Sequence, residues 1–105
     1  MSVVTMISGR LLGAPEQRQT KDNKVIVKAT VQARLGRDQN ELWTVLAYDR
    51  AAQAELMRLS AGEFVALQGV HQVRAATIHG EIVVQRTIFP EVVIGLKPKK
   101  GFSND

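Results

Sequence analysis

Residues 42–69 predict a strand, a short helix and a second strand in direct succession. The first part, with Trp43 and Tyr48, has the aromatic and β-branched composition typical of strands. The second strand spans about residues 64–67 and ends before Gly69. One short helix inside an otherwise β chain of 105 residues favours a small barrel that the helix plugs.

The helix has its own start, face and stop signals. Asp49 can cap its N-terminus, because an Asp side chain accepts hydrogen bonds from the first free backbone N–H groups. Three apolar residues recur at helical spacing and predict one buried face: Ala52, Leu56 and Leu59. Gly62 is expected to stop the helix by taking a left-handed conformation.

Residues 24–35 show the clearest alternation in the chain and predict a half-buried strand. The expected inner face consists of Val25, Val27, Ala29, Val31, Ala33 and Leu35. The expected outer face consists of Lys24, Ile26, Lys28, Thr30, Gln32 and Arg34.

The other strands are expected at residues 3–12, 63–78 and 81–89. Residues 13–23 have the composition of a polar connection, and 36–40 that of a turn. His79 and Gly80 predict a tight reversal. Pro90 interrupts the last strand, which can continue beyond a break at 92–96.

Three segments resemble the bacterial single-stranded-DNA-binding protein (SSB) family. They are GRLLGAPEQR at 9–18, VLAYDRAA at 45–52 and AGEFVALQG at 61–69, in the family's order. The resemblance covers most of residues 6–84. It implies an OB-fold, a five-stranded Greek-key barrel that binds oligonucleotides across one face. The expected class is therefore all-β with one short helix.

Length and composition set independent limits. The length predicts one domain over residues 1–96, followed by a short, disordered basic tail at 97–105. The net charge of +4 and pI near 9.9 favour a polyanionic partner. No cysteine, secretory signal or membrane-length apolar run is present, so we expect a cytoplasmic protein of bacterial, plasmid or phage origin.

Basic residues on the strands and the preceding loop are the candidate phosphate contacts, because a groove of such side chains can follow a nucleic-acid backbone. They are Arg18, Lys21, Lys24, Lys28, Arg34, Arg74 and Arg86. Outward lysines and arginines also prevent strand edges from associating, which is the alternative interpretation.

Aromatic residues are the candidate base-stacking groups. Tyr48 stands where the SSB family usually has a DNA-contacting Phe. Trp43 is five residues earlier, so strict alternation places it on the opposite face. Either a bulge restores its side or Trp43 lies in the core. A second stacking position of the family is Ala76 here, and the hairpin at 79–80 is expected to be short, so binding should depend more on charge.

Catalysis and metal binding find no support in the sequence. His71 and His79 are the only histidines, and neither lies in a metal-ligand or His–carboxylate motif. No phosphate loop of the G-x-x-x-x-G-K-[ST] type occurs. We therefore expect no enzyme activity, no cofactor and no metal.

The first hypothesis is a protein that binds single-stranded DNA with little sequence preference in replication, recombination or repair. The second is an interaction module for a helicase or another replication protein, as in the related primosomal replication protein N, with weak DNA binding. RNA is a third candidate ligand. The apolar first strand predicts a homodimer or homotetramer. The acidic tip by which SSB proteins recruit partners is not found.

Overall fold

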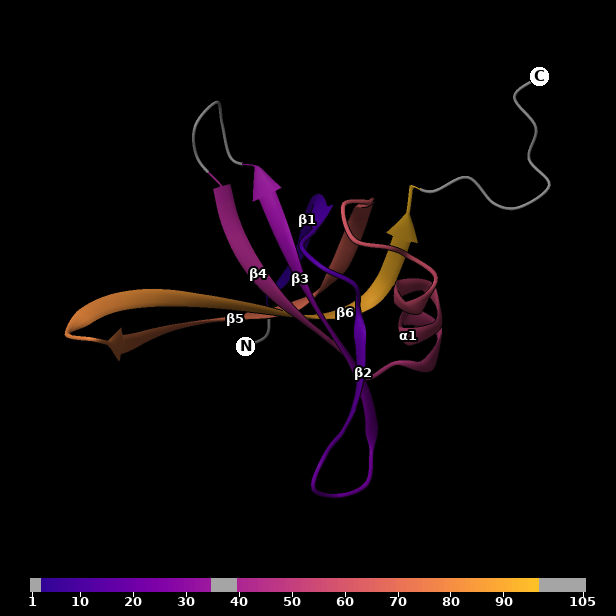
Figure 1. Cartoon of the computed structure of the whole chain (residues 1–105), viewed down its shortest axis with the longest axis horizontal. Helices are drawn as coiled ribbons and strands as arrows, with labels where there is room; N and C mark the ends of the chain where they lie inside the picture. Colours follow the sequence, from indigo (N-terminus) through magenta and orange to yellow (C-terminus); the bar gives the residue numbers. More distant parts are fainter. Residues whose placement is uncertain (1–2, 35–39, 97–105) are drawn as a thin grey trace.

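Six strands and one helix make up the regular structure of residues 3–34 and 40–96, which a computed structural model describes. In chain order they are β1 (Val4–Leu11), β2 (Glu16–Gln19), β3 (Val25–Arg34), β4 (Asn40–Ala47), α1 (Arg50–Met57), β5 (Phe64–Ile78) and β6 (Glu81–Gly95). Figure 1 shows them around one central barrel. The predicted tail and the turn before β4 lie outside the described residues, apart from Asn40.

Five strands close into a barrel in the order β1, β3, β4, β6, β5 and back to β1. All neighbours are antiparallel except β4 and β6, which run parallel. This crossed connectivity is the Greek-key OB-fold that the sequence predicts. The predicted fold class is confirmed for the described part of the chain.

Strand β1 closes the barrel because it pairs on both of its edges. Residues 4–10 pair with β5, and residues 9–11 pair with β3. Gly9 lies where the two ladders overlap, and a Cβ there would overlap the backbone carbonyl of Gln32 in β3. A glycine is therefore required at the closure point.

The core fills the barrel with the inward residues of the alternating strands. The predicted inner face of residues 24–35 is confirmed at Val27, Ala29, Val31 and Ala33, all buried. Val25 is half-exposed, because it lies beyond the end of the barrel. The remaining buried apolar residues are Leu11, Trp43, Val45, Ala47, Ala52, Leu56, Leu59, Val65, Leu67 and Ile88.

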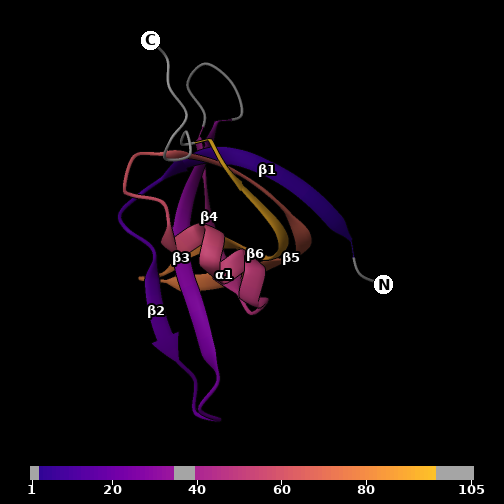
Figure 2. The same cartoon turned by 90° about the vertical axis from the view of Figure 1, so that its right-hand side faces the viewer.

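Helix α1 packs against β6, β3 and β4 and covers one side of the barrel (Figure 2). Asp49 caps it as predicted, with Oδ2 accepting from the Ala52 N–H at 3.1 Å. The predicted apolar face is buried. Gly62 does not stop the helix, which ends at Met57. Gly62 instead takes φ +86° in the turn before β5, where its N–H donates to the Leu11 carbonyl.

The polar connection predicted at 13–23 contains a strand that the sequence did not indicate. β2 pairs with residues 25–28 of β3, the half of that strand that β1 leaves open. All four residues of β2 are exposed. Apolar alternation could not reveal β2, because neither of its faces is buried.

Pro90 does not break β6, which runs unbroken to Gly95. The β5 ladder shifts register here, with Gly69 opposite Pro90 and Gln68 opposite Val92, so one extra residue forms a bulge. Pro90 also lies beyond Ile88, the last partner of β4, so its missing N–H costs no bond to that strand.

The hairpin of β5 and β6 is long, contrary to the prediction. Its turn is tight, with positive φ at His79 and Gly80, but the ladder continues outward to the pair Ile78 and Glu81. Such a two-residue turn matches the strand twist and allows pairing to the tip. The two strands extend from the barrel as an arm, at the left in Figure 1.

We expect Gly9→Ala to lower the free energy of unfolding by about 1–3 kcal/mol, because the new methyl group forces β1 away from β3. Urea denaturation followed by circular dichroism measures this change. Ser8→Ala, at an exposed neighbouring position, should stay within roughly 0.5 kcal/mol of the parent chain. Equal stability of the two variants would contradict the role of Gly9 in closure.

Candidate nucleic-acid interface

The outer side of β3, β4 and β6 forms one continuous surface. Thr30 pairs with Thr44, which pairs with Thr87, so these hydroxyl side chains lie on the same side of the sheet. Lys28 lies opposite Leu46 on that side and is exposed. This surface, called the outer face below, offers small polar and apolar groups beside a cation.

Two aromatic rings lie at one end of the outer face. Tyr48 directly follows β4 and is 53% exposed. Its ring centroid is 6.2 Å from that of Phe89 in β6, with the ring planes 36° apart. An exposed ring supported by a second ring provides a platform on which a base can stack. Phe89 was not predicted as a site residue, since only the pairing of β6 with β4 brings it beside Tyr48.

Trp43 lies in the barrel core, which is the second of the two predicted alternatives. Its ladder with β3 is regular, so no bulge turns it outward, and it is 7% exposed. Its Nε1 donates to Glu41 Oε1 at 3.1 Å, and its ring meets His71 edge-on at 5.8 Å. Trp43 therefore presents no free ring face to a ligand.

Two of the predicted cations are paired with carboxylates of the protein. Arg18, on β2, pairs with Glu16 at 2.7 Å, and this bond together with the charges of Arg18 and Lys28 holds the Glu16 pKa below its usual value. Arg86 turns toward the barrel end, where its Nε is 3.1 Å from Glu41 Oε2. A phosphate would have to compete with these carboxylates.

Three other cations were predicted as site residues. Arg74 lies on the arm, on the side that continues the outer face through Gln72 and Thr87. Lys21 lies exposed in the turn between β2 and β3. The Arg34 side chain lies outside what the structure describes. These positions do not form one cluster with Lys28.

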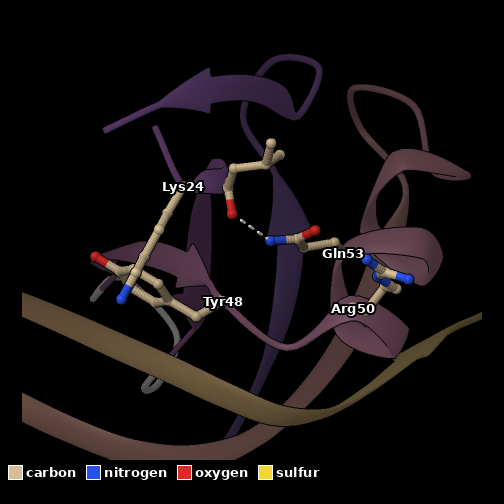
Figure 3. Close-up of a pocket in the computed structure, with 5 residues that line it drawn as sticks. Lys24, Tyr48, Arg50 and Gln53 are labelled. Carbon is tan, nitrogen blue, oxygen red and sulfur yellow. Dashed lines mark hydrogen bonds between the residues drawn. The ribbon is translucent and has the colours of Figure 1, made fainter. Parts of the chain in front are cut away.

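A pocket of about 580 Å³ opens beside Tyr48, where β3 begins, β4 ends and α1 begins. Its lining consists of Lys24, Val25, Tyr48, Arg50 and Gln53. Figure 3 shows Lys24 beside Tyr48, and Gln53 and Arg50 on the side of α1. Lys24 and Tyr48 were predicted as site residues. Arg50 and Gln53 were not predicted as site residues, because the sequence pattern of their helix indicates only packing against the barrel.

No group of three His, Asp or Glu side chains in the described residues could hold a metal ion. No helix in the same residues is long and apolar enough to cross a membrane.

Comparison with known proteins gives matches in structure only. No protein-family model and no curated protein sequence matches the chain. A small single-stranded DNA-binding protein from Streptomyces coelicolor superposes with a TM-score of 0.69 at 19% identity, covering 90% of this chain and 94% of that one. The mitochondrial single-stranded DNA-binding protein Rim1 of S. cerevisiae gives 0.74 at 12% identity, covering 94% and 99%.

The chain has the fold of these single-stranded DNA-binding proteins. The match extends over nearly the whole length of both chains. At these identities the likeness shows the fold, and the function has to be argued from the outer face and the pocket.

We expect the fluorescence of Trp43, the sole tryptophan, to show a buried indole in the native chain. Its emission should lie at short wavelength and iodide should quench it weakly, because the barrel core excludes the ion. The same sample in denaturant provides the control and should be quenched strongly. Native quenching as strong as in denaturant would place Trp43 at the surface.

Proposed function

We propose that this protein binds single-stranded DNA with little sequence preference across the outer face. The observation that carries the proposal is the exposed Tyr48 ring, supported by Phe89 and flanked by Lys24 and Lys28 on an OB-fold barrel. Stacking on a ring is sequence-tolerant, because every base has a π-face. Both solved structures reported above are single-stranded DNA-binding proteins by name, which supports this ligand.

Duplex DNA fits this surface poorly. Its bases are stacked inside the helix, so Tyr48 could contact a base face only after the strands separate. Single strands expose their base faces, and the hydroxyls of Thr30, Thr44 and Thr87 can then contact sugar or phosphate. The proposed ligand is therefore a flexible single strand.

Charge should contribute less to the affinity for single strands than the number of basic residues indicates. Arg18 and Arg86 are paired with carboxylates, whereas Lys24, Lys28 and Arg74 have no ion pair within residues 3–34 and 40–96. Each phosphate neutralised on a single strand contributes about 0.7 to the slope of log K against log salt. With about three unpaired cations, the slope should be modest, near 2.

The cellular role belongs to the same proposal. Binding of exposed single strands serves replication, recombination or repair, and we place the protein in the cytoplasm. RNA is an alternative ligand because OB-folds bind both polymers. The interaction-module hypothesis, with a helicase or another replication protein as partner, is favoured by a second surface that carries exposed apolar residues.

This second surface is the outer side of β1, β5 and β6, and it suits self-association. Six apolar side chains on it are between 43% and 71% exposed: Val4, Met6, Phe64, Val92, Ile94 and Leu96. Residues 4–8 of β1 pair only with β5, so one edge of this segment has no strand partner in the described chain. We infer a homodimer that pairs these edges, and a tetramer if the apolar faces then pack together.

We expect Tyr48→Ala to weaken binding of a labelled dT oligomer by about tenfold or more, because stacking is worth roughly 1–3 kcal/mol per base. Fluorescence anisotropy against single strands and matched duplex measures the loss. Tyr48→Phe should retain most of the affinity. Binding that is equal for duplex and single strand, or unchanged in Tyr48→Ala, would contradict the proposal.

The lysines are tested in the same assay across a salt series. Lys24→Gln and Lys28→Gln should each reduce the salt slope by about 0.7, because each removes one phosphate contact. Arg58→Gln is the matched control, because Arg58 lies at the opposite end of α1 from the pocket and pairs with Glu55. A similar change in Arg58→Gln would mean that only the net charge matters.

For assembly, we expect Met6→Glu to shift the protein toward monomers, because it places a carboxylate in the apolar face of β1. Sedimentation velocity over a concentration series measures this shift. Gln85→Glu, an exposed change opposite Arg74 on the arm, is the control for charge. A parent chain that stays monomeric at every concentration would overturn the inferred dimer.

A further inference from the structure

A second cavity, of about 210 Å³, lies where the chain passes from the end of β1 into β2 and along β3. Its lining includes Glu16 and Arg18 of β2 and Lys28 and Thr30 of β3. Lys28 pairs with Glu16 on one side and with Leu46 on the other, so these side chains lie in one row across three strands. The cavity therefore extends the outer face beyond Lys28, on the side away from β4 and β6.

The lining of this cavity brings together groups that suit a phosphate. Arg18 and Lys28 are both exposed, and Thr30 follows two residues after Lys28 on the same side of β3. A guanidinium, an ammonium and a hydroxyl commonly contact phosphate oxygens in protein complexes with nucleic acids. The wall formed by the loop after β1 is held in place, because the Leu12 N–H donates to the Thr30 carbonyl at 2.9 Å.

A carboxylate of the protein already uses one of these cations. Glu16 Oε2 accepts a hydrogen bond from Arg18 Nη2 at 2.7 Å. This bond, and then the charges of Arg18 and Lys28, hold the pKa of the Glu16 carboxyl below its usual value, so the lining favours negative charge. The side chains of Arg18 and Glu16 are 56% and 61% exposed. An ion pair so open to water is weak, and another anion can replace the carboxylate.

We propose that this cavity is a phosphate site of the single strand, formed by Arg18 and Lys28, and that Glu16 occupies Arg18 until a phosphate displaces it. The proposal rests on the proposed binding of single strands and adds one contact to it. A guanidinium can hold a phosphate through two parallel N–H bonds, and Lys28 supplies a second charge at the same anion. Glu16 acts as a competitor of the strand and lowers its affinity.

The competitor is tested by removing its charge. We expect Glu16→Gln to bind a labelled dT oligomer about two- to fivefold more tightly at low salt, because no exposed ion pair has to open. The slope of log K against log salt should become steeper by up to about 0.7, since Arg18 then contributes as an unpaired cation. Glu81→Gln, the same charge change at the tip of the arm, is the matched control and should leave both values nearly unchanged.

A double-mutant cycle then locates the gain at Arg18. Arg18→Gln in the Glu16→Gln protein should remove the gain in affinity. The same change in the parent chain should cost less, because there the phosphate gains Arg18 only by breaking its pair with Glu16. Equal costs in both proteins, or an equal gain in Glu81→Gln, would mean that only the net charge matters and would overturn the proposal.

The outcomes separate this phosphate site from the proposed function. Binding of dT that needs Tyr48 but is unchanged in Glu16→Gln would refute the phosphate site and leave the proposed function intact. No binding of the oligomer at low salt, by the parent chain or by Glu16→Gln, would refute the proposed function and the phosphate site with it.

Discussion

The double pairing of β1 is the constraint on which the rest of the structure depends. Without its ladders to β5 and β3, the sheet would be open and the inward side chains would face water. The Gly9 backbone lies too close to the Gln32 carbonyl of β3 to leave room for a side chain, so the closed barrel is most stable with a glycine there. Closure also gives the sheet an inner and an outer side. Alternate residues of each strand therefore point either into the core or toward the surface.

This separation explains why one aromatic side chain of this segment is buried and the other is exposed. Trp43 and Tyr48 differ by an odd number of positions, so a regular strand sends Trp43 into the core and leaves Tyr48 outside. Charge is divided in a similar way. Arg86 lies on the inward side and meets Glu41, while Lys28 on the outward side remains exposed. The proposed binding surface is therefore narrow, with the Tyr48 and Phe89 rings at one end and few unpaired cations among the described residues.

Much of this arrangement could be predicted from local patterns. The alternation over residues 24–35 gave the central strand, and Asp49 correctly marked the start of the helix. The predictions that failed depend on distant contacts. β2 has no buried face, and Pro90 is tolerated because the pairing of β6 with β4 ends at Ile88 and the ladder with β5 shifts register beside Pro90. The parallel pairing that brings Phe89 beside Tyr48 joins residues 41 positions apart, and no local pattern encodes it.

The central claim is that a single strand lies across the outer face of β3, β4 and β6, with one base on Tyr48. The most direct measurement is a ¹H–¹⁵N NMR titration of the assigned protein with a short dT oligomer. We expect the largest shifts at the amides of Lys28, Tyr48 and Phe89, with β1 nearly unchanged. Shifts concentrated on Val4–Ser8 and the apolar outer side of β1, β5 and β6 would contradict the account.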